Sequence, residues 1–363
     1  MIFIVICVKY FHYIMTLPIE SIFYNQESYQ KLQNYIELSN PSSVFVLVDE
    51  HTRVHCLPIL KNHFQHNFQL LEIPAGESFK NIETVQKLWQ KLTDLGADRK
   101  SLLINLGGGV LTDMGGFVAL TFKRGMSFIN IPTTLLGMVD AAIGGKTGID
   151  FNDLKNQIGI IAPPEMVLID PEYLKTLSSR EFMSGMAEVF KYGLIADETL
   201  WNKLIQFDGN HLDPHFIFTA AEIKKNIVIQ DPFENGIRKS LNFGHTLGHA
   251  IETYFMSKAS DTRLLHGEAI AVGMVMAAHL SHQTLDLPLL KTAEIKRILQ
   301  KFYKPIFLNT NDILHILELL KHDKKNFKDQ INFVLLRNIG DVLWDCQVTE
   351  FQIRKAIAYY LED

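Results

Sequence analysis

The chain has 363 residues, of which 47% are hydrophobic, and its 35 basic and 40 acidic residues give a net charge of −5. This balance excludes the basic surplus typical of a nucleic-acid-binding protein, and a chain of this length favours two domains over one core. The three cysteines, Cys7, Cys56 and Cys346, are odd in number and far apart. They argue against a disulfide framework and favour a reducing compartment, so we expect a cytoplasmic protein.

The N-terminal segment is strongly apolar, but it fits neither a membrane span nor a signal peptide. The run from Met1 to Met15 is shorter than the roughly 20 residues that a span needs, and Lys9 interrupts it. It lacks a leading basic region and a small-residue cleavage site. We therefore expect Met15 to be the natural start, residues 1–14 to be a non-native or disordered extension, and no membrane association.

Short apolar runs alternate with helical patterns in the first half of the chain. The runs cover residues 44–48, 101–106, 128–131 and 166–169, and a helical pattern covers residues 83–95. Apolar strands separated by helices predict a parallel sheet with crossover helices. We predict an α/β nucleotide-binding domain over residues 15–177.

The pattern changes after Leu177, where apolar residues recur at helical spacing. These segments cover residues 180–206, 214–230, 243–256, 267–285, 291–302 and 311–321, and one late β-like run covers residues 332–336. We predict a mainly helical second domain over residues 178–363.

Three segments stand where the predicted strands end, which is where parallel sheets bind ligands. Gly107-Gly-Gly109 leads to Asp113 and would let a phosphate approach the start of a helix, although the spacing is not that of a dinucleotide fingerprint and a tight turn without a ligand is the alternative. Asp49 could bind ribose hydroxyls, but taken alone it is better explained as a helix cap. Thr133 and Thr134 could contact a ligand or cap the next helix.

A glycine-rich segment around Lys146 carries a second cationic motif. Gly144-Gly-Lys-Thr147 resembles the end of a P-loop, but Asp140 occupies the position of the first P-loop glycine, so we exclude a P-loop NTPase. Lys155 follows nine residues later. The glycine density favours a binding site over a solvated loop.

Polar residues recur at helical spacing from Arg238 onward. Arg238, Asn242, His245 and His249 are spaced by four, three and four, which predicts one polar helix face. Glu188 precedes Lys191 by three residues on an apolar helix, where an ordinary ion pair is the simpler explanation.

His266 opens a further apolar helix. Glu188, His266 and either His245 or His249 would together provide three ligands and an open position, as catalytic zinc requires. The residues alone do not decide between the two histidines.

These motifs occur in the order found in a known family. Between Val44 and Ile339 the chain resembles the 3-dehydroquinate synthases, a family of sugar phosphate cyclases. The resemblance rests on Gly107-Gly-Gly-Val-x-x-Asp113, Pro132-Thr-Thr, Val139-Asp140, Gly-Gly-Lys146-Thr-Gly, Lys155-Asn156, Glu188-x-x-Lys191-Tyr-Gly, Lys224 with Asp231, Arg238-x-x-x-Asn242-x-Gly-His245-Thr-x-Gly-His249, His266-Gly-Glu and Asp323-Lys324-Lys325.

The resemblance implies a role for each matched position. Zinc, or cobalt in its place, would be held by Glu188, His245 and His266, while His249 would face the substrate phosphate. NAD+ would be bound by Asp49, Glu77, Lys80, Gly108, Gly109, Val110, Asp113, Thr133, Thr134, Lys146, Lys155 and Thr176. The small anionic sugar-phosphate substrate would meet Asp140, Lys146, Lys191, Lys224, Arg238, Asn242, one of Lys324 and Lys325, and Arg124 from the neighbouring subunit of a homodimer.

The implied reaction converts 3-deoxy-arabino-heptulosonate 7-phosphate to 3-dehydroquinate and phosphate, and it regenerates the NAD+ that it uses. This is a step of the shikimate pathway. Ala141-Ala142 stands where the family usually has a serine pair, so contacts by those hydroxyls are not transferred. The alternatives are another sugar phosphate cyclase, a metal-dependent polyol or glycerol-phosphate dehydrogenase, and an inactive relative.

Overall fold

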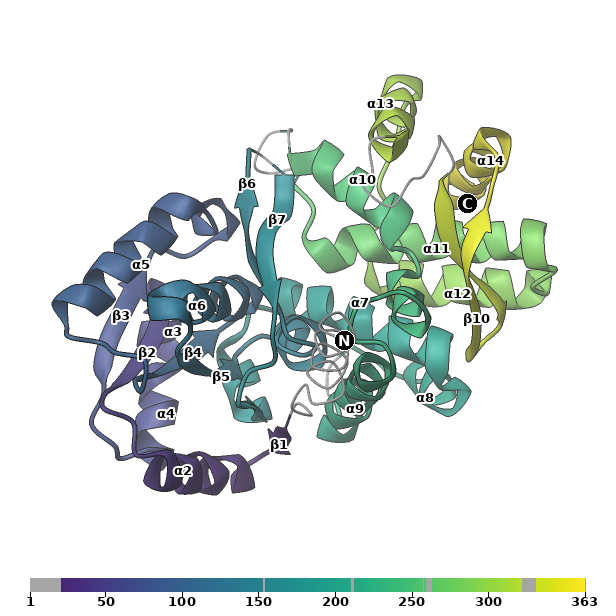
Figure 1. Cartoon of the computed structure of the whole chain (residues 1–363). Coiled ribbons are helices and arrows are strands. Elements are labelled where there is room, and N and C mark those ends of the chain that lie inside the picture. Colours follow the sequence, from purple (N-terminus) through teal and green to yellow (C-terminus); the bar gives the residue numbers. More distant parts are fainter. Residues whose placement is uncertain are drawn as a thin grey trace, which may run out of the picture. The chain divides into compact units, whose positions relative to one another are not determined.

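The computed structural model describes residues 21–152, 154–209, 212–256, 258, 263–321 and 331–362. The chain divides into two compact units, Met1–Leu177 and Ser178–Asp363 (Figure 1), and each is described by itself. The N-terminal extension expected at residues 1–14 lies outside the described residues.

Unit 1 contains a six-stranded sheet with helices between the strands. Its helices are α2 (Glu27–Ser39), α3 (Glu50–His55), α4 (Leu57–His63), α5 (Ile82–Asp94) and α6 (Gly109–Thr121), with short turns η1 (Glu77–Phe79), η2 (Phe122–Arg124), η3 (Gly137–Ala141) and η4 (Pro171–Thr176). Its strands are β1 (Ile22–Tyr24), β2 (Val44–Asp49), β3 (Gln69–Ile73), β4 (Leu102–Gly107), β5 (Ser127–Pro132), β6 (Lys146–Phe151), β7 (Leu154–Ile161) and β8 (Met166–Ile169).

The order of the strands locates the ligand edge of this sheet. The order is β1-β8-β5-β4-β2-β3, and every neighbouring pair is parallel. The chain moves outward from β2 to β3 and then crosses back to β4, from which it proceeds the other way. The direction therefore reverses between β2 and β4, and such a switch point is where open parallel sheets bind their ligands.

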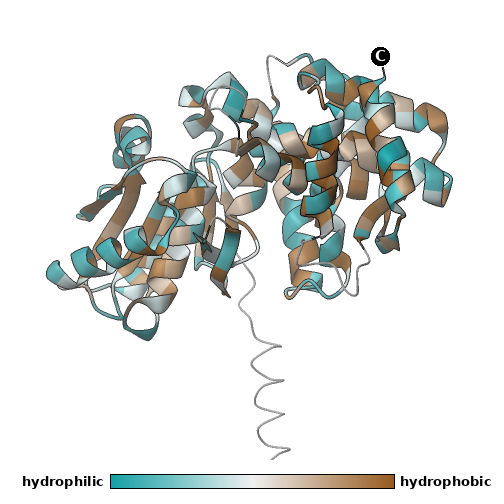
Figure 2. Ribbon diagram, turned by 90° about the horizontal axis from the view of Figure 1, so that it is seen from above, coloured by the Kyte–Doolittle hydropathy of each residue, from teal (hydrophilic) through white to brown (hydrophobic). Residues whose placement is uncertain are grey.

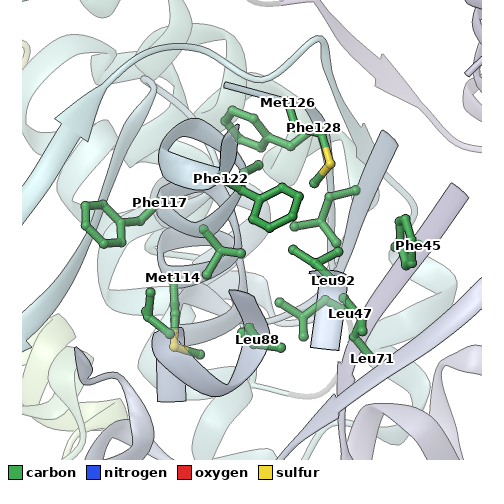
Figure 3. Close-up of a cluster of buried hydrophobic side chains, with 14 of the residues drawn as sticks. Phe45, Leu47, Leu71, Leu88, Leu92, Met114, Phe117, Phe122, Met126 and Phe128 are labelled. Carbon is green, nitrogen blue, oxygen red and sulfur yellow. The ribbon is translucent and has the colours of Figure 1, made fainter. Parts of the chain in front are cut away.

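Both faces of the sheet are covered, as a parallel sheet requires. Phe45 and Leu47 of β2 pack into a core cluster with α5 and α6 (Figure 3). Val46 and Val48 alternate with them on the opposite face and are equally buried. The strands are accordingly mostly hydrophobic in Figure 2, whereas the helices combine hydrophobic and hydrophilic residues. The predicted α/β class and its four strands are confirmed.

The sequence patterns did not predict four strands of unit 1. β3 and β1 lie at the two edges of the sheet, are short, and mix polar with apolar residues. β6 and β7 form a separate antiparallel hairpin that packs on α6. The segment from Lys146 is not the solvated loop that was the alternative to a binding site, because it continues directly as β6.

Unit 2 is mainly helical, as predicted. Its helices are α7 (Ser179–Ala196), α8 (Glu198–Leu204), α9 (Pro214–Gln230), α10 (His245–Met256), α11 (His266–Leu285), α12 (Leu289–Phe302), α13 (Thr310–Lys321) and α14 (Glu350–Leu361), with the 3₁₀ turn η5 (Ile237–Asn242). The expected late strand is β9 (Asn332–Asn338), which pairs with an unexpected β10 (Asp341–Gln347). None of the described helices combines the length and the hydropathy of a membrane span.

The helical pattern over residues 180–206 was wrong as a single element. Asp197 has an extended backbone, with φ of −149°, and its Oδ1 accepts a hydrogen bond from the Leu200 N–H at 3.0 Å. An aspartate in this conformation is an N-cap, so it ends α7 and starts α8.

Glycines bring α10 and α11 into close contact. A Cβ built on Gly273 of α11 would lie 2.0 Å from the carbonyl oxygen of Gly244, which is just before α10. Gly244 itself has φ of +77°, a conformation that favours glycine and lets the chain turn into α10. The helix that carries His245 and His249 is therefore packed backbone-to-backbone against the helix that His266 opens.

Candidate active site

Three of the predicted ligand segments meet at the carboxyl edge of the unit 1 sheet. Gly107 at the end of β4 is in register with Pro132 at the end of β5, and the Thr133 N–H donates to the Gly107 carbonyl at 3.1 Å. Asp49 ends the adjacent strand β2, and Gly108, Gly109 and Val110 open α6. These positions flank the switch point, where free N–H groups of a helix start fit a pyrophosphate.

Asp49 and Thr134 also have structural roles. The Asp49 Oδ1 accepts from the Thr52 N–H at 2.7 Å, and Thr52 Oγ1 accepts from the Asp49 N–H at 2.9 Å, which makes a reciprocal cap on α3. Thr134 Oγ1 accepts from the Gly137 N–H at 3.0 Å. The capping interpretation of both residues is confirmed, and it does not exclude contact with a cofactor.

A buried ion pair connects Lys80 with Asp113. The Lys80 Nζ lies 2.6 Å from Asp113 Oδ2 and 2.6 Å from Asn156 Oδ1. Burial alone would lower the pKa of Lys80, but the carboxylates of Asp113, Glu77 and Asp150 outweigh it, so the pKa is raised. Lys80 is thus a charged lysine fixed inside unit 1 beside the start of α6.

A second contact joins the same region to the β6–β7 hairpin. Lys155 Nζ lies 3.9 Å from Glu77 Oε1. The structure thus brings Glu77, Lys80, Asp113 and Lys155 together, although the sequence spreads them over three segments.

The remaining predicted residues of unit 1 lie at different places. Asp140 is half-buried in the π-helical turn η3, and Lys146 is exposed at the start of β6. Thr176 lies in η4, with its hydroxyl 3.3 Å from the Tyr173 carbonyl.

Arg124 is exposed and has a φ of +72°, and the preceding residue, Lys123, has a φ of +48°. Two such residues in succession are an energetically costly arrangement, which proteins retain mainly at functional positions.

In unit 2, Glu188, His245 and His266 form a compact candidate metal centre. One ligand atom from each lies within 4.8 Å of the others. The His245 Nε2 is 3.4 Å and the His266 Nε2 is 3.5 Å from the same Glu188 oxygen, Oε1. The carboxylate comes from α7 and the imidazoles from the starts of α10 and α11, so three helices converge on one point.

Glu188 has the environment expected of a metal ligand. Its side chain is fully buried, and neither carboxylate oxygen makes a hydrogen bond with the described residues. Lys191, which is 1% exposed, is its ion-pair partner. A fully buried carboxylate is costly, and although Lys191 pairs with Oε2, the Oε1 that faces both imidazoles makes no hydrogen bond with the described residues. A divalent ion bound by Glu188 and the two imidazoles would satisfy this oxygen. The residues present therefore fit Zn²⁺ or Co²⁺.

The two imidazoles have opposite pKa shifts. Burial, together with the charge of Lys191 and the neighbouring His249 and His266, lowers the pKa of His245 well below its usual value. Burial acts in the same direction on His266, but the carboxylates of Glu188 and Glu252 outweigh it and raise the pKa to about 10. An imidazole binds a metal only in its neutral form, so binding of the ion at His266 competes with protonation.

His249 belongs to a second, overlapping cluster. Its ring centroid lies 5.1 Å from that of His245 and 5.8 Å from that of His266. His249, Glu252 and His266 also place ligand atoms within 4.8 Å of one another. His249 therefore lies next to the candidate metal centre without belonging to the set of Glu188, His245 and His266.

The predicted polar helix face from Arg238 to His249 was wrong as a single helix. Arg238 and Asn242 lie in the 3₁₀ turn η5, and the turn at Gly244 separates them from α10. The cause is the positive φ of Gly244, which no α-helix contains.

Arg238 is held rigidly in this turn. Its side chain is 2% exposed, and its Nη1 donates to the Pro232 carbonyl at 2.6 Å. The Asp231 carboxylate accepts from the N–H groups of Arg238, Gly236 and Asn235, and although partial burial opposes it, these hydrogen bonds lower the pKa of Asp231.

Buried cations of unit 2 lie on elements that pack together. Lys191 is on α7, Lys224 is 6% exposed on α9, and Arg238 is in η5; these three elements contact one another. Lys324 and Lys325 lie outside the described residues.

Sequence reasoning missed two carboxylates beside the site. Glu234 accepts from the Asn242 amide at 2.7 Å, and Glu252 lies 3.2 Å from His266 Nδ1. The signal for Glu252 was present, since it follows His245 by seven residues and His249 by three, on one face of α10.

The chain belongs to the 3-dehydroquinate synthase family. Residues 70–184 match the family model for the 3-dehydroquinate synthase N-terminal domain, and residues 185–326 match that for the C-terminal domain. A 3-dehydroquinate synthase of Parabacteroides distasonis is 40% identical over 92% of this chain and 95% of that protein. One from Streptococcus suis is 39% identical over 84% of this chain and 87% of that protein.

Solved structures of sugar phosphate cyclases share the fold. A 2-deoxy-scyllo-inosose synthase, solved with carbaglucose-6-phosphate, NAD+ and Co²⁺, is 25% identical with a TM-score of 0.82, over 93% of this chain and 95% of that one. The 2-epi-5-epi-valiolone synthase of Streptomyces hygroscopicus, with NAD+ and Zn²⁺ bound, is 26% identical with a TM-score of 0.78, over 94% and 96%. A protein of Sinorhizobium meliloti described as a probable glycerol dehydrogenase, at 15% identity and a TM-score of 0.59, shares the fold alone.

Proposed function

We propose that this enzyme is a 3-dehydroquinate synthase, which converts 3-deoxy-arabino-heptulosonate 7-phosphate to 3-dehydroquinate and phosphate in the shikimate pathway. The observation that carries the proposal is the sequence identity of 40%, over 92% of this chain, to a curated 3-dehydroquinate synthase, against an identity of 25% to 2-deoxy-scyllo-inosose synthase.

We assign the cofactors to the two parts of the chain separately. Residues 15–177 form the NAD+-binding domain, and residues 178–363 form the metal- and substrate-binding domain. When bound, NAD+ would accept a hydride from the carbon that bears a substrate hydroxyl group and would later return it, and the divalent ion would polarise the oxygen of that hydroxyl group and lower its pKa. The overall reaction is thus an elimination of phosphate and a ring closure without net oxidation.

Glu188, His245 and His266 hold the ion. The burial of Glu188 supports this assignment, because its Oε1 faces both imidazole nitrogens and makes no hydrogen bond with the described residues. Lys191 lies against the same carboxylate and would face the part of the substrate nearest the metal.

The buried cations of unit 2 bind the anionic groups of the substrate. Its carboxylate and its phosphate both prefer charge-assisted hydrogen bonds from lysine and arginine. Lys191, Lys224 and Arg238 are buried, and Arg238 is pre-oriented by Asp231 and Pro232. His249 and Asn242 complete this set, and Asp140 and Lys146 of unit 1 belong to the substrate residues as well.

In unit 1 the cofactor residues are those around the switch point and the Lys80 pair. Lys80 holds Asp113 and Asn156 by direct contacts, which orders the start of α6 and the hairpin around one point. A lysine so fixed keeps its charge while it positions the backbone that faces the cofactor.

We also propose a homodimer in which Arg124 reaches the substrate phosphate of the neighbouring subunit. The strained backbone at Lys123 and Arg124 supports a functional role. The β6–β7 hairpin exposes the apolar side chains of Phe151, Leu154, Ile158 and Ile161, which a second copy would cover. Sedimentation velocity measures the mass directly, and a monomer at micromolar concentration would contradict this assignment.

A cytoplasmic location is part of the proposal. The two cysteines in the described residues, Cys56 and Cys346, are free thiols, as is usual in a reducing compartment.

The deciding experiment uses purified enzyme with the heptulosonate phosphate, a catalytic amount of NAD+ and Zn²⁺. We expect release of phosphate and formation of 3-dehydroquinate in equal amounts, over many turnovers for each NAD+. Stoichiometric accumulation of NADH would indicate a dehydrogenase. Turnover of a sugar phosphate without a carboxylate, such as glucose 6-phosphate, but not of the heptulosonate would indicate another cyclase.

A further inference from the structure

We propose that Glu252 is a positioning residue for the metal ligand His266: its carboxylate accepts the Nδ1–H of the imidazole and thereby fixes the tautomer that presents Nε2 to the ion. This inference rests on the metal set of the proposed function, and it adds a residue outside that set. It concerns affinity for the metal rather than contact with the substrate.

The distances around His266 define the two ends of its ring. Nδ1 lies 3.2 Å from Glu252 Oε2, and Nε2 lies 3.5 Å from Glu188 Oε1. An ionised carboxylate only accepts, so Nδ1 must carry the proton that it shares with Glu252. With the proton on Nδ1, the lone pair of Nε2 is available to an ion that Glu188 also binds.

His245 has the same arrangement with a weaker partner. Its Nδ1 lies 3.1 Å from the carbonyl oxygen of Phe243, while its Nε2 also faces Glu188. Both ligand imidazoles therefore donate from Nδ1 and leave Nε2 for the metal. A carboxylate is the stronger acceptor, and it also increases the basicity of the ligand. His266 is the most exposed member of the set, with 26% of its side chain exposed, so a partner that fixes its ring is useful there.

The fold makes this contact rigid. Glu252 is 5% exposed and lies two turns after His245 on α10, while His266 opens α11. The two helices pack closely where Gly273 meets the backbone of Gly244. One face of α10 thus supplies a ligand of its own and orients the ligand of the neighbouring helix.

The same residues allow one other explanation, in which Glu252 binds a cation directly. His249, Glu252 and His266 are close enough to form a second set. Occupation of both sets would require the His266 imidazole to bridge two ions after losing both of its N–H protons. The hydrogen bond to Glu252 needs no such loss, and for this reason we favour it.

The test compares variants at position 252 in the full-length enzyme. Glu252→Leu keeps the volume and removes the acceptor, Glu252→Ala is a second removal, and Glu252→Gln keeps an acceptor oxygen without the charge. Asp312→Asn is the matched control. Asp312 lies on α13, is similarly buried, and accepts a hydrogen bond from the hydroxyl of Tyr254, which is on the same helix as Glu252. Affinity for Zn²⁺ is measured by competition with a chromogenic chelator, and the Co²⁺-substituted enzyme gives a visible spectrum.

We expect the removals to weaken Zn²⁺ binding by about 10- to 100-fold, as loss of such outer hydrogen bonds does at other sites. Glu252→Gln should recover most of the affinity, and Asp312→Asn should bind as the wild type does even where its melting temperature falls. Wild-type affinity in both removals would overturn the inference. The inference would also be overturned if each wild-type chain bound two ions and if Glu252→Leu and His249→Ala lost zinc equally, because Glu252 would then be a metal ligand.

Failure of the proposed function would look different. The wild type would then bind no zinc, or His266→Ala would bind it unchanged. Only if the wild type binds one ion and His266→Ala loses it do the variants of Glu252 report on positioning.

Discussion

The ammonium of Lys80 and the carboxylate of Asp113 lie 2.6 Å apart, which links the turn before α5 to the second turn of α6 across 33 residues. The lysine side chain is 4% exposed and the aspartate 20%. The pair is therefore shielded from solvent on one side and accessible on the other. It stabilises the part of unit 1 to which we assign the cofactor.

We expect a measurable coupling between these two residues. Lys80→Met leaves a partly buried carboxylate without its partner, so it should destabilise unit 1 and weaken NAD+ binding. In a double-mutant cycle with Asp113→Asn, the coupling free energy should be about 1–3 kcal/mol by urea unfolding. Additive effects of the two substitutions would show that the pair contributes nothing to stability.

The metal set predicts different outcomes for two neighbouring histidines. His266→Ala should abolish retention of zinc and activity, because it removes one of three ligands. His249→Ala should keep about one zinc per chain and lose activity with the substrate. Elemental analysis after gel filtration measures both, and equal loss of zinc would mean that the ligands are wrongly assigned.

Lys224 and Lys225 offer a matched comparison on one helix. Lys224 is 6% exposed, whereas Lys225 pairs with Glu222 at the surface. Lys224→Met should reduce kcat/KM for the heptulosonate phosphate by about 100-fold or more, the equivalent of one lost charge-assisted hydrogen bond of roughly 3 kcal/mol. Lys225→Met should change it less than twofold. Similar effects in both variants would point to a general effect of charge.

Gly273→Ala should separate α10 from α11. The new Cβ would meet the Gly244 carbonyl at 2.0 Å, and backbone cannot move aside as a side chain can. We expect a loss of at least about 3 kcal/mol, above the usual range for overpacking, together with weaker zinc binding. Thermal unfolding and chelator competition measure the two effects. Unchanged zinc affinity would show that the spacing of the helices does not control the metal set.

Cys56 should be unreactive in the folded enzyme. Burial raises the pKa of its thiol to about 11. A raised pKa favours the neutral thiol, so at pH 8 only roughly a thousandth is thiolate, against about a quarter of an unperturbed cysteine. Alkylation by iodoacetamide, followed by peptide mass spectrometry, should label Cys56 only after denaturation. Rapid labelling of the native enzyme would show that this part of unit 1 opens.

The sequence predicted a structural element correctly wherever the environment of that element also determines its local residue pattern. Buried strands such as 44–48 are apolar throughout because helices cover both faces of a parallel sheet, and that composition is visible without coordinates. The edge strand Gln69–Ile73 was missed because its exposed side permits polar residues. The division of 180–206 was missed because it depends on the conformation of Asp197, which apolar spacing does not record.

By itself, the sequence determined the fold class, the order of the motifs and the types of residue available for a metal, a dinucleotide and an anionic substrate. Chemistry restricts which side chains can do such work, so their identity and spacing carry that information. Only the tertiary structure decided which of them meet. It brought Glu188, His245 and His266 together from three helices. It placed Arg238 and His249 on separate elements, because the chain turns at Gly244. It also placed the Glu252 carboxylate within hydrogen-bonding distance of His266 Nδ1. These contacts depend on the distance between packed helices. For α10 and α11 that distance depends on Gly244 and Gly273, which are far apart in the sequence.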